Sequence, residues 1–106
     1  MKEQLERMFP GAVVTEGDSF VSVRCGDVAM NFVKPKGNRG RFSGAVGADD
    51  KDVAIGLFAD SLHVLLSCLR ESVKNETVMA PTKTARARAA RVLRVLDAAK
   101  LDEVNR

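Results

Sequence analysis

Residues 49–74 constrain the fold most, because their apolar side chains recur with the period of an α-helix over about seven turns. One stripe faces a single direction, and further apolar residues make it wider than the stripe of an ordinary surface helix. The stripe holds Phe58, Leu62, Leu65, Leu69 and Val73, the residues beside it are Ala54, Ile55 and Leu66, and a flank holds Val53, Leu57, Val64 and Cys68. We therefore expect one long helix with Asp49 as its N-cap, covered on two sides by a sheet and by a second helix or subunit.

Three short segments before this helix are rich in β-branched residues and bounded by turn signals. They are residues 12–15, 19–25 and 28–34. A two-residue turn at Gly26-Asp27, with glycine first, pairs Cys25 with Val28 and Val23 with Met30. A second turn at Gly17-Asp18 places Val14 opposite Val21. Both registers put apolar side chains on the same face, which predicts an antiparallel meander.

The rest of the chain adds two helices and one weak strand. Residues 2–9 form a short helix ended by Pro10-Gly11, and residues 42–46 alternate in a way that permits a fourth strand. A last helix begins at Thr82 or Thr84 and continues to about residue 104. The sequence therefore predicts one α+β domain over residues 1–106. Its sheet has three or four antiparallel strands, the long central helix packs on one sheet face, and the C-terminal helix runs antiparallel to it.

A basic loop is the strongest functional signal. It contains four cations, Lys34, Lys36, Arg39 and Arg41, and residues 34–48 carry a net charge of +4 with no acidic residue. Such a loop can follow a phosphate backbone, because each cation releases counterions from it, and Phe42 can stack on a base. The alternatives are a solvated hairpin loop or a contact with an acidic protein surface. The sequence does not distinguish DNA from RNA.

The last helix carries a row of arginines that points away from its apolar stripe. The row consists of Arg86, Arg88, Arg91 and Arg94. Arginines at helical spacing usually form a solvated face, and these can pair with Asp60 and Glu71 of the preceding helix. If this arginine row and the basic loop lie on the same side of the molecule, the case for an anionic ligand is stronger.

Some apolar positions are surplus to the expected core. Val53, Leu57 and Val64 flank the long helix beside Cys68, and Phe20 and Val33 fall on the outer face of the sheet. Either the last helix covers the flank or the flank forms a homodimer or partner surface.

No motif for catalysis stands out. Asp60, His63 and Ser67 offer the residue types of a hydrolase triad, but a straight helix provides neither a nucleophile turn nor an oxyanion site. No metal-ligand spacing or phosphate-loop motif is present, so we expect no catalytic residue, no metal and no cofactor. Cys25 and Cys68 lie on apolar faces and are expected to be free, buried thiols.

The order helix, three strands, helix is similar to that of double-stranded RNA-binding domains. Those domains open the second helix with lysines that grip phosphate, whereas Asp49-Asp50-Lys51-Asp52 stand here, which argues against membership. The chain has no apolar run of spanning length and no secretory signal, so we expect a cytoplasmic protein without a membrane partner.

Two hypotheses follow for a non-enzymatic chain. The first is nucleic-acid binding through the basic loop and the arginine-bearing helix. The alternative is a protein-interaction module, such as a small regulator or inhibitor encoded by a phage or another mobile element.

Overall fold

The computed structural model describes residues 1–35 and 40–100 of the chain. Its elements are α1 (Lys2–Met8), β1 (Val13–Glu16), β2 (Phe20–Cys25), β3 (Val28–Val33), β4 (Phe42–Ala48), β5 (Lys51–Ala59), α2 (Leu62–Met79) and α3 (Lys83–Ala98). The α+β class, the antiparallel meander and the helices at both ends are as predicted. The sheet has five strands rather than three or four.

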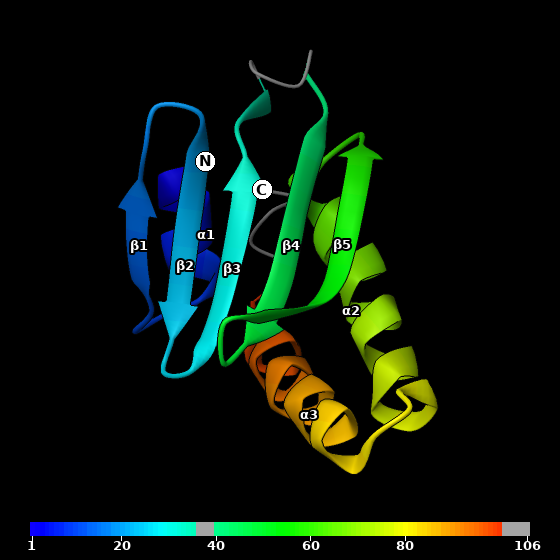
Figure 1. Cartoon of the computed structure of the whole chain (residues 1–106). Helices are drawn as coiled ribbons and strands as arrows, with labels where there is room; N and C mark the ends of the chain where they lie inside the picture. The colour runs from blue at the N-terminus through cyan, green and yellow to red at the C-terminus, as the bar shows by residue number, and fades with distance from the viewer. Residues whose placement is uncertain (36–39, 101–106) are drawn as a thin grey trace.

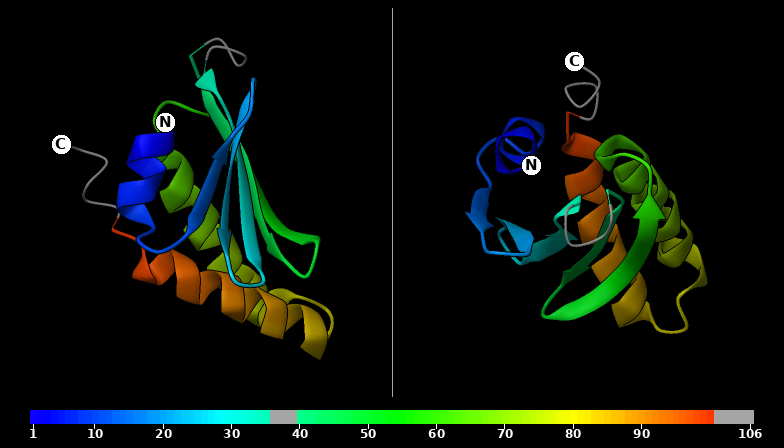
Figure 2. Two further views of the ribbon diagram at one scale, coloured as in Figure 1. Left: turned by 90° about the vertical axis from the view of Figure 1, so that its left-hand side faces the viewer. Right: turned by 90° about the horizontal axis from the view of Figure 1, so that it is seen from above.

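The strands lie in chain order, so β1 and β5 are the two edges of the sheet (Figure 1). Figure 2 shows all three helices on one face of this sheet. One continuous core of side chains fills the space between the two layers. Among residues 1–35 and 40–100, no helix covers the opposite face, which we call the outer face.

The registers of the first three strands show how far turn chemistry determines pairing. Cys25 faces Val28 and Val23 faces Met30, as the turn at Gly26-Asp27 predicts. The predicted pairing of β1 with β2 is wrong by two residues, since Val14 faces Val23. The turn is displaced by one residue, because the N–H of Gly17 donates to the carbonyl oxygen of Phe20 at 2.8 Å and leaves Asp18 and Ser19 between them. A shift of two residues keeps every side chain on its predicted face.

The helix predicted over residues 49–74 is wrong in its first part. Residues 51–59 form β5, and a tight turn connects them to β4. Asp49 and Asp50 have φ of 55° and 61°, the left-handed conformation that a type I′ hairpin turn requires at both central positions. Asp49 is therefore a turn residue. Ser61 is the N-cap of α2, where its hydroxyl accepts a hydrogen bond from the N–H of Val64 at 3.1 Å.

Close contact between β5 and α2 depends on Gly56. A Cβ atom on Gly56 would lie 2.6 Å from Cδ1 of Leu65, so the missing side chain lets the helix approach the strand directly. Helix α3 begins as predicted at Thr82, whose hydroxyl accepts from the N–H of Ala85 at 3.0 Å. Arg70 in the middle of α2 pairs with Asp97 near the end of α3 at 2.5 Å, as antiparallel helices require.

Candidate functional site

Of the basic loop, Lys34 directly follows β3 and Arg41 directly precedes β4, at one end of the sheet. Lys34 pairs with Glu16 at 3.2 Å, and Arg41 pairs with Asp60 at 3.0 Å. Phe42 is partly buried against the core. Lys36 and Arg39 lie outside the described residues. The two cations that are described therefore already have carboxylate partners within the chain.

Arg91 ties α3 to two hairpin turns. Its guanidinium donates to the carboxylates of Asp27, in the β2–β3 turn, and of Asp49, in the β4–β5 turn. The hydrogen bond from Arg91 holds the pKa of Asp49 below its ordinary value, and Asp49 raises the pKa of Arg91 in return. These contacts assign Arg91 to holding the fold together at this end of the sheet.

The other arginines of α3 have different surroundings. Arg86 donates to the carbonyl oxygen of Ala80 at 2.8 Å, at the C-cap of α2, where cations are favoured. The Nε atom of Arg88 is buried without a hydrogen-bond partner among the described residues. Arg94 is exposed and lines an apolar hollow. The predicted pairing of this row with Asp60 and Glu71 is wrong, since Asp60 binds Arg41 and the ion pair between the helices uses Arg70.

The two basic regions do not share a side. In Figure 1 the end of β3 and the start of β4 are at the top of the sheet and α3 is at the bottom, and the first view of Figure 2 shows the same separation. Lys34 and Arg41 lie at the end of the sheet where β3 ends and β4 begins, whereas Arg88 and Arg91 lie on α3 at the opposite end. A single short anionic ligand therefore cannot contact both groups.

The predicted apolar flank is exposed in part. Leu57 is 66% exposed and Val64 is 43% exposed, whereas Val53 is partly buried against the core. On the outer face Phe20 lies opposite Val33, and Phe20 is also exposed. The last helix therefore does not cover the Leu57 and Val64 side of the chain.

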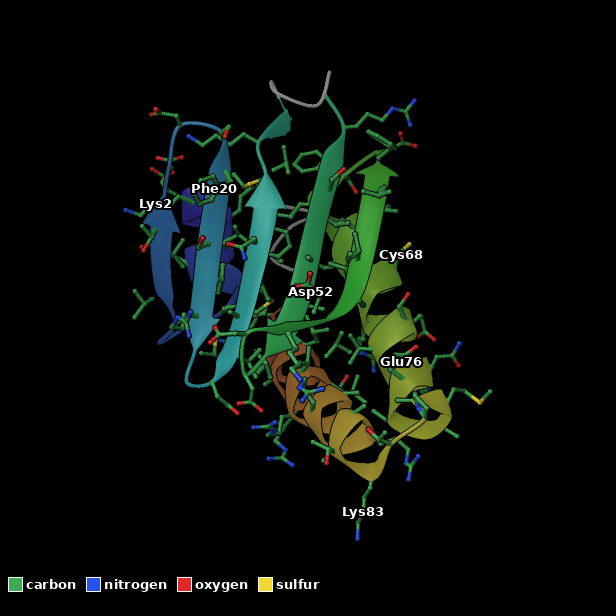
Figure 3. All side chains as sticks on the ribbon, in the orientation of Figure 1. Lys2, Phe20, Asp52, Cys68, Glu76 and Lys83 are labelled. Carbon is green, nitrogen blue, oxygen red and sulfur yellow. The ribbon has the colours of Figure 1, made fainter. Side chains whose placement is uncertain are left out.

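Cys68 lies on α2, one helical turn after Val64 on the exposed side of that helix. It is an exposed free thiol, so the prediction that it is buried is wrong, whereas Cys25 is free and half-buried as its apolar face suggests. Figure 3 shows Cys68 on α2 beside β5, pointing away from the body of the sheet.

Two further exposed residues were predicted to lie on or beside the apolar stripe that the long helix turns toward the core, and this prediction is wrong. Ile55 and Phe58 of β5 are 62% and 58% exposed. Phe58 sits in a β-bulge with φ of 56°, a conformation that a bulky residue rarely adopts. Its N–H donates to the hydroxyl of Ser43 at 3.0 Å, which fixes the bulge. A strand assignment for residues 51–59 is the signal that places Ile55 and Leu57 on one exposed face.

The residues considered for a triad are not arranged as one. Asp60 precedes α2 rather than lying on it, and its carboxylate is bound to Arg41. Nδ1 of His63 is buried and has no hydrogen-bond partner among the described residues. Within residues 1–35 and 40–100 there is no group of three or more potential metal-ligating side chains. Within the same residues, no helix is long and apolar enough to cross a bilayer.

Comparison with known proteins gives no match. The chain matches no protein-family model, no curated protein and no solved structure at a significant level. The geometry of the described residues is therefore what any functional proposal must rest on.

We expect the Arg91→Gln substitution to weaken the dependence of stability on acid pH. Because the folded pKa of Asp49 is lowered, its contribution to stability is complete above the unfolded pKa of about 3.9 and is lost as the pH falls through the folded pKa. Urea unfolding at neutral pH and at about pH 3 measures this loss. The wild type should lose more stability than the variant, with Arg94→Gln as the control. Equal losses in wild type and Arg91→Gln would contradict the assignment.

Proposed function

We propose that the chain is a non-enzymatic protein-interaction module that binds through one apolar edge. This surface, the β5–α2 edge, consists of Ile55, Leu57, Phe58, Val64 and Cys68. The observation that carries the proposal is the exposure of these side chains on the edge strand and on the helix that directly follows it.

Four of these exposed side chains are large, and the five come from two elements that pack against each other, β5 and α2. Single exposed apolar residues are ordinary, but several of them on adjacent elements are typical of a contact surface. Strand β5 pairs only with β4 among the described strands, so its other side also presents backbone groups to a partner. No charged residue interrupts the strand between Val53 and Ala59.

The strained backbone conformation of Phe58 also supports the proposal that the β5–α2 edge is a contact surface. A non-glycine residue in the left-handed region costs about 1 kcal/mol or more, and such residues concentrate at functional sites. Here the strain accompanies an aromatic ring that is exposed rather than buried. Aromatic side chains contribute strongly to protein interfaces, so a partner that covers Phe58 gains apolar contact.

The bulges of β5 limit how a partner can bind. Its register with β4 shifts at two places on β4, between Val46 and Gly47 and between Phe42 and Gly44. The stretch over which the two strands pair regularly is therefore short. Bulged edge strands resist open-ended strand addition. We therefore expect a contact made by side chains of β5 and α2, with either a second copy of the chain or another protein. A small regulator or inhibitor, as phages and other mobile elements encode, needs such a surface and no catalytic site.

Aspartate substitutions test the surface in two assays. Leu57→Asp and Val64→Asp should abolish self-association measured by light scattering after size-exclusion chromatography, or abolish retention of a defined protein from nuclease-treated lysate. Val13→Asp is the matched control, since Val13 is equally exposed on the opposite edge strand. The proposal fails if both variants behave as the wild type in both assays, or if Val13→Asp has the same effect.

Nucleic-acid binding through the basic loop is the second candidate. It is favoured by the acid-free net charge of +4 over residues 34–48, although Lys34 and Arg41 have internal partners. A titration of labelled duplex and single strands at two salt concentrations tests it. Binding that weakens with salt and is lost when all four loop cations become glutamate supports this candidate. No binding at low salt removes it.

A further inference from the structure

An apolar hollow of about 280 Å³ lies where the end of α1, the end of β2 and the last turns of α3 meet. Its walls include Phe9, Pro10, Cys25, Arg94, Val95 and Ala98. Helix α1 and strand β2 lie toward the β1 edge of the sheet, so the hollow is separate from the β5–α2 edge. It is therefore a second candidate site with a chemistry of its own.

Among the described residues, Arg94 is the charged residue in the wall of this hollow, and no described carboxylate lines it. Within the described part of the chain Arg94 forms no ion pair, whereas Arg91 and Arg70 are each bound to aspartates. Asp97, one turn further along α3, is already paired with Arg70 at 2.5 Å. The guanidinium of Arg94 is thus available to an anion at the mouth of an apolar hollow.

We propose that this hollow binds a small amphipathic carboxylate, with the carboxylate on Arg94 and an apolar chain between α1 and α3. A guanidinium matches a carboxylate through two parallel hydrogen bonds. Ligand sites generally combine apolar walls with a few polar groups that fix orientation, and this hollow is slightly smaller than their usual range of about 300–1,000 Å³. A water molecule occupies about 30 Å³ in the liquid, and a methylene group is of similar size, so the hollow accommodates a chain of about eight to ten carbons.

A carboxylate fits better than a phosphate because the hollow offers one cation. Phosphate groups in proteins are generally held by several cations or by clustered backbone N–H groups. A purely apolar ligand leaves the guanidinium without a partner and gains nothing from it. The charge and the volume together therefore define the ligand class.

Cys25 provides a direct readout of occupancy. Its thiol lies in the wall of the hollow, and burial raises its pKa, so its alkylation is already slow. A chain that fills the hollow covers this thiol and slows alkylation further. Cys68 is exposed on α2 and serves as the internal reference for the same reaction.

The test measures maleimide alkylation of both cysteines with decanoate, below its micelle concentration, as the probe. At about ten times the dissociation constant, decanoate should slow alkylation of Cys25 about tenfold and leave Cys68 unchanged. Arg94→Gln should weaken protection about fivefold in concentration, because an ion pair at an exposed arginine is lost. Ala98→Leu, which places bulk in the hollow, should also weaken protection.

Two comparisons separate the outcomes. Arg88→Gln controls for the general loss of a positive charge on α3, and decanol tests the chain without its carboxylate. The proposal is overturned by an absence of protection, by equal protection from decanol, or by full protection in Arg94→Gln. Circular dichroism of each variant confirms that the fold is intact, which is expected because Arg94 and Ala98 are both exposed.

Discussion

Gly47→Ala is expected to lower the free energy of unfolding by about 3 kcal/mol, one of the two largest effects of a single substitution in this chain. A Cβ atom at this position would overlap the carbonyl oxygen of Lys51 and would lie 3.0 Å from Cα of Asp52. Both atoms belong to the backbone of β5, so no side-chain rotation relieves the overlap. The β4–β5 hairpin must open instead.

Urea unfolding measures this loss, and Gly17→Ala is the matched control. The three atoms nearest to a Cβ atom on Gly17 all belong to the ring of Phe20, the first at 3.2 Å, and this ring is exposed and can turn away. The control should therefore change stability by about 1 kcal/mol or less. A Gly47→Ala variant as stable as the control would show that the backbone of β5 lies further from Gly47 of β4 than described.

Phe32→Ala is the second large expected effect, with a loss of about 3–5 kcal/mol. Phe32 is fully buried and is among the largest side chains of the core. Its ring lies over Gly44 of β4, where a Cβ atom would be 2.6 Å from the ring. Deleting the ring leaves a cavity between the sheet and the helices that the surrounding side chains fill only in part. Since domains are stable by about 5–15 kcal/mol, the variant should be close to unfolding at room temperature.

Phe20→Ala distinguishes burial from the loss of an aromatic ring. Phe20 and Phe32 lie on the adjacent strands β2 and β3, but Phe20 faces outward and is 47% exposed. The expected loss is about 1 kcal/mol or less, measured by the same urea unfolding. Similar losses in the two variants would contradict the assignment of the inner and outer faces.

The prediction of the sheet succeeded where a turn determined the register. Gly26 takes φ of 63°, which glycine adopts at no steric cost, and the pairing from Cys25 to Phe20 follows from it. The prediction failed at residues 49–59, because residues 53–59 are uniformly apolar and fit a helix as well as a strand. Two consecutive aspartates in the left-handed conformation are uncommon, so the turn before β5 gave a weak signal.

The sites were harder to predict than the fold. Residue spacing identified the cations, but ion pairs between distant segments, such as Arg91 with Asp27, depend on the closed tertiary structure. The exposure of Leu57 and Val64 was one of two alternatives, and only the position of α3 decides between them. Ile55 and Phe58 were assigned to the core side because a helix over the same residues directs both side chains toward the apolar stripe, whereas the strand leaves them exposed.

The contacts of Arg91 also bear on the order in which the chain folds. They join residues 64 and 42 positions apart, whereas the hairpins of the meander form between neighbouring segments. Contacts between distant residues close large loops and tend to form late. Interactions formed after the transition state slow unfolding without accelerating folding. Arg91 is therefore positioned to lengthen the lifetime of the native state by holding α3 against two turns that form without it.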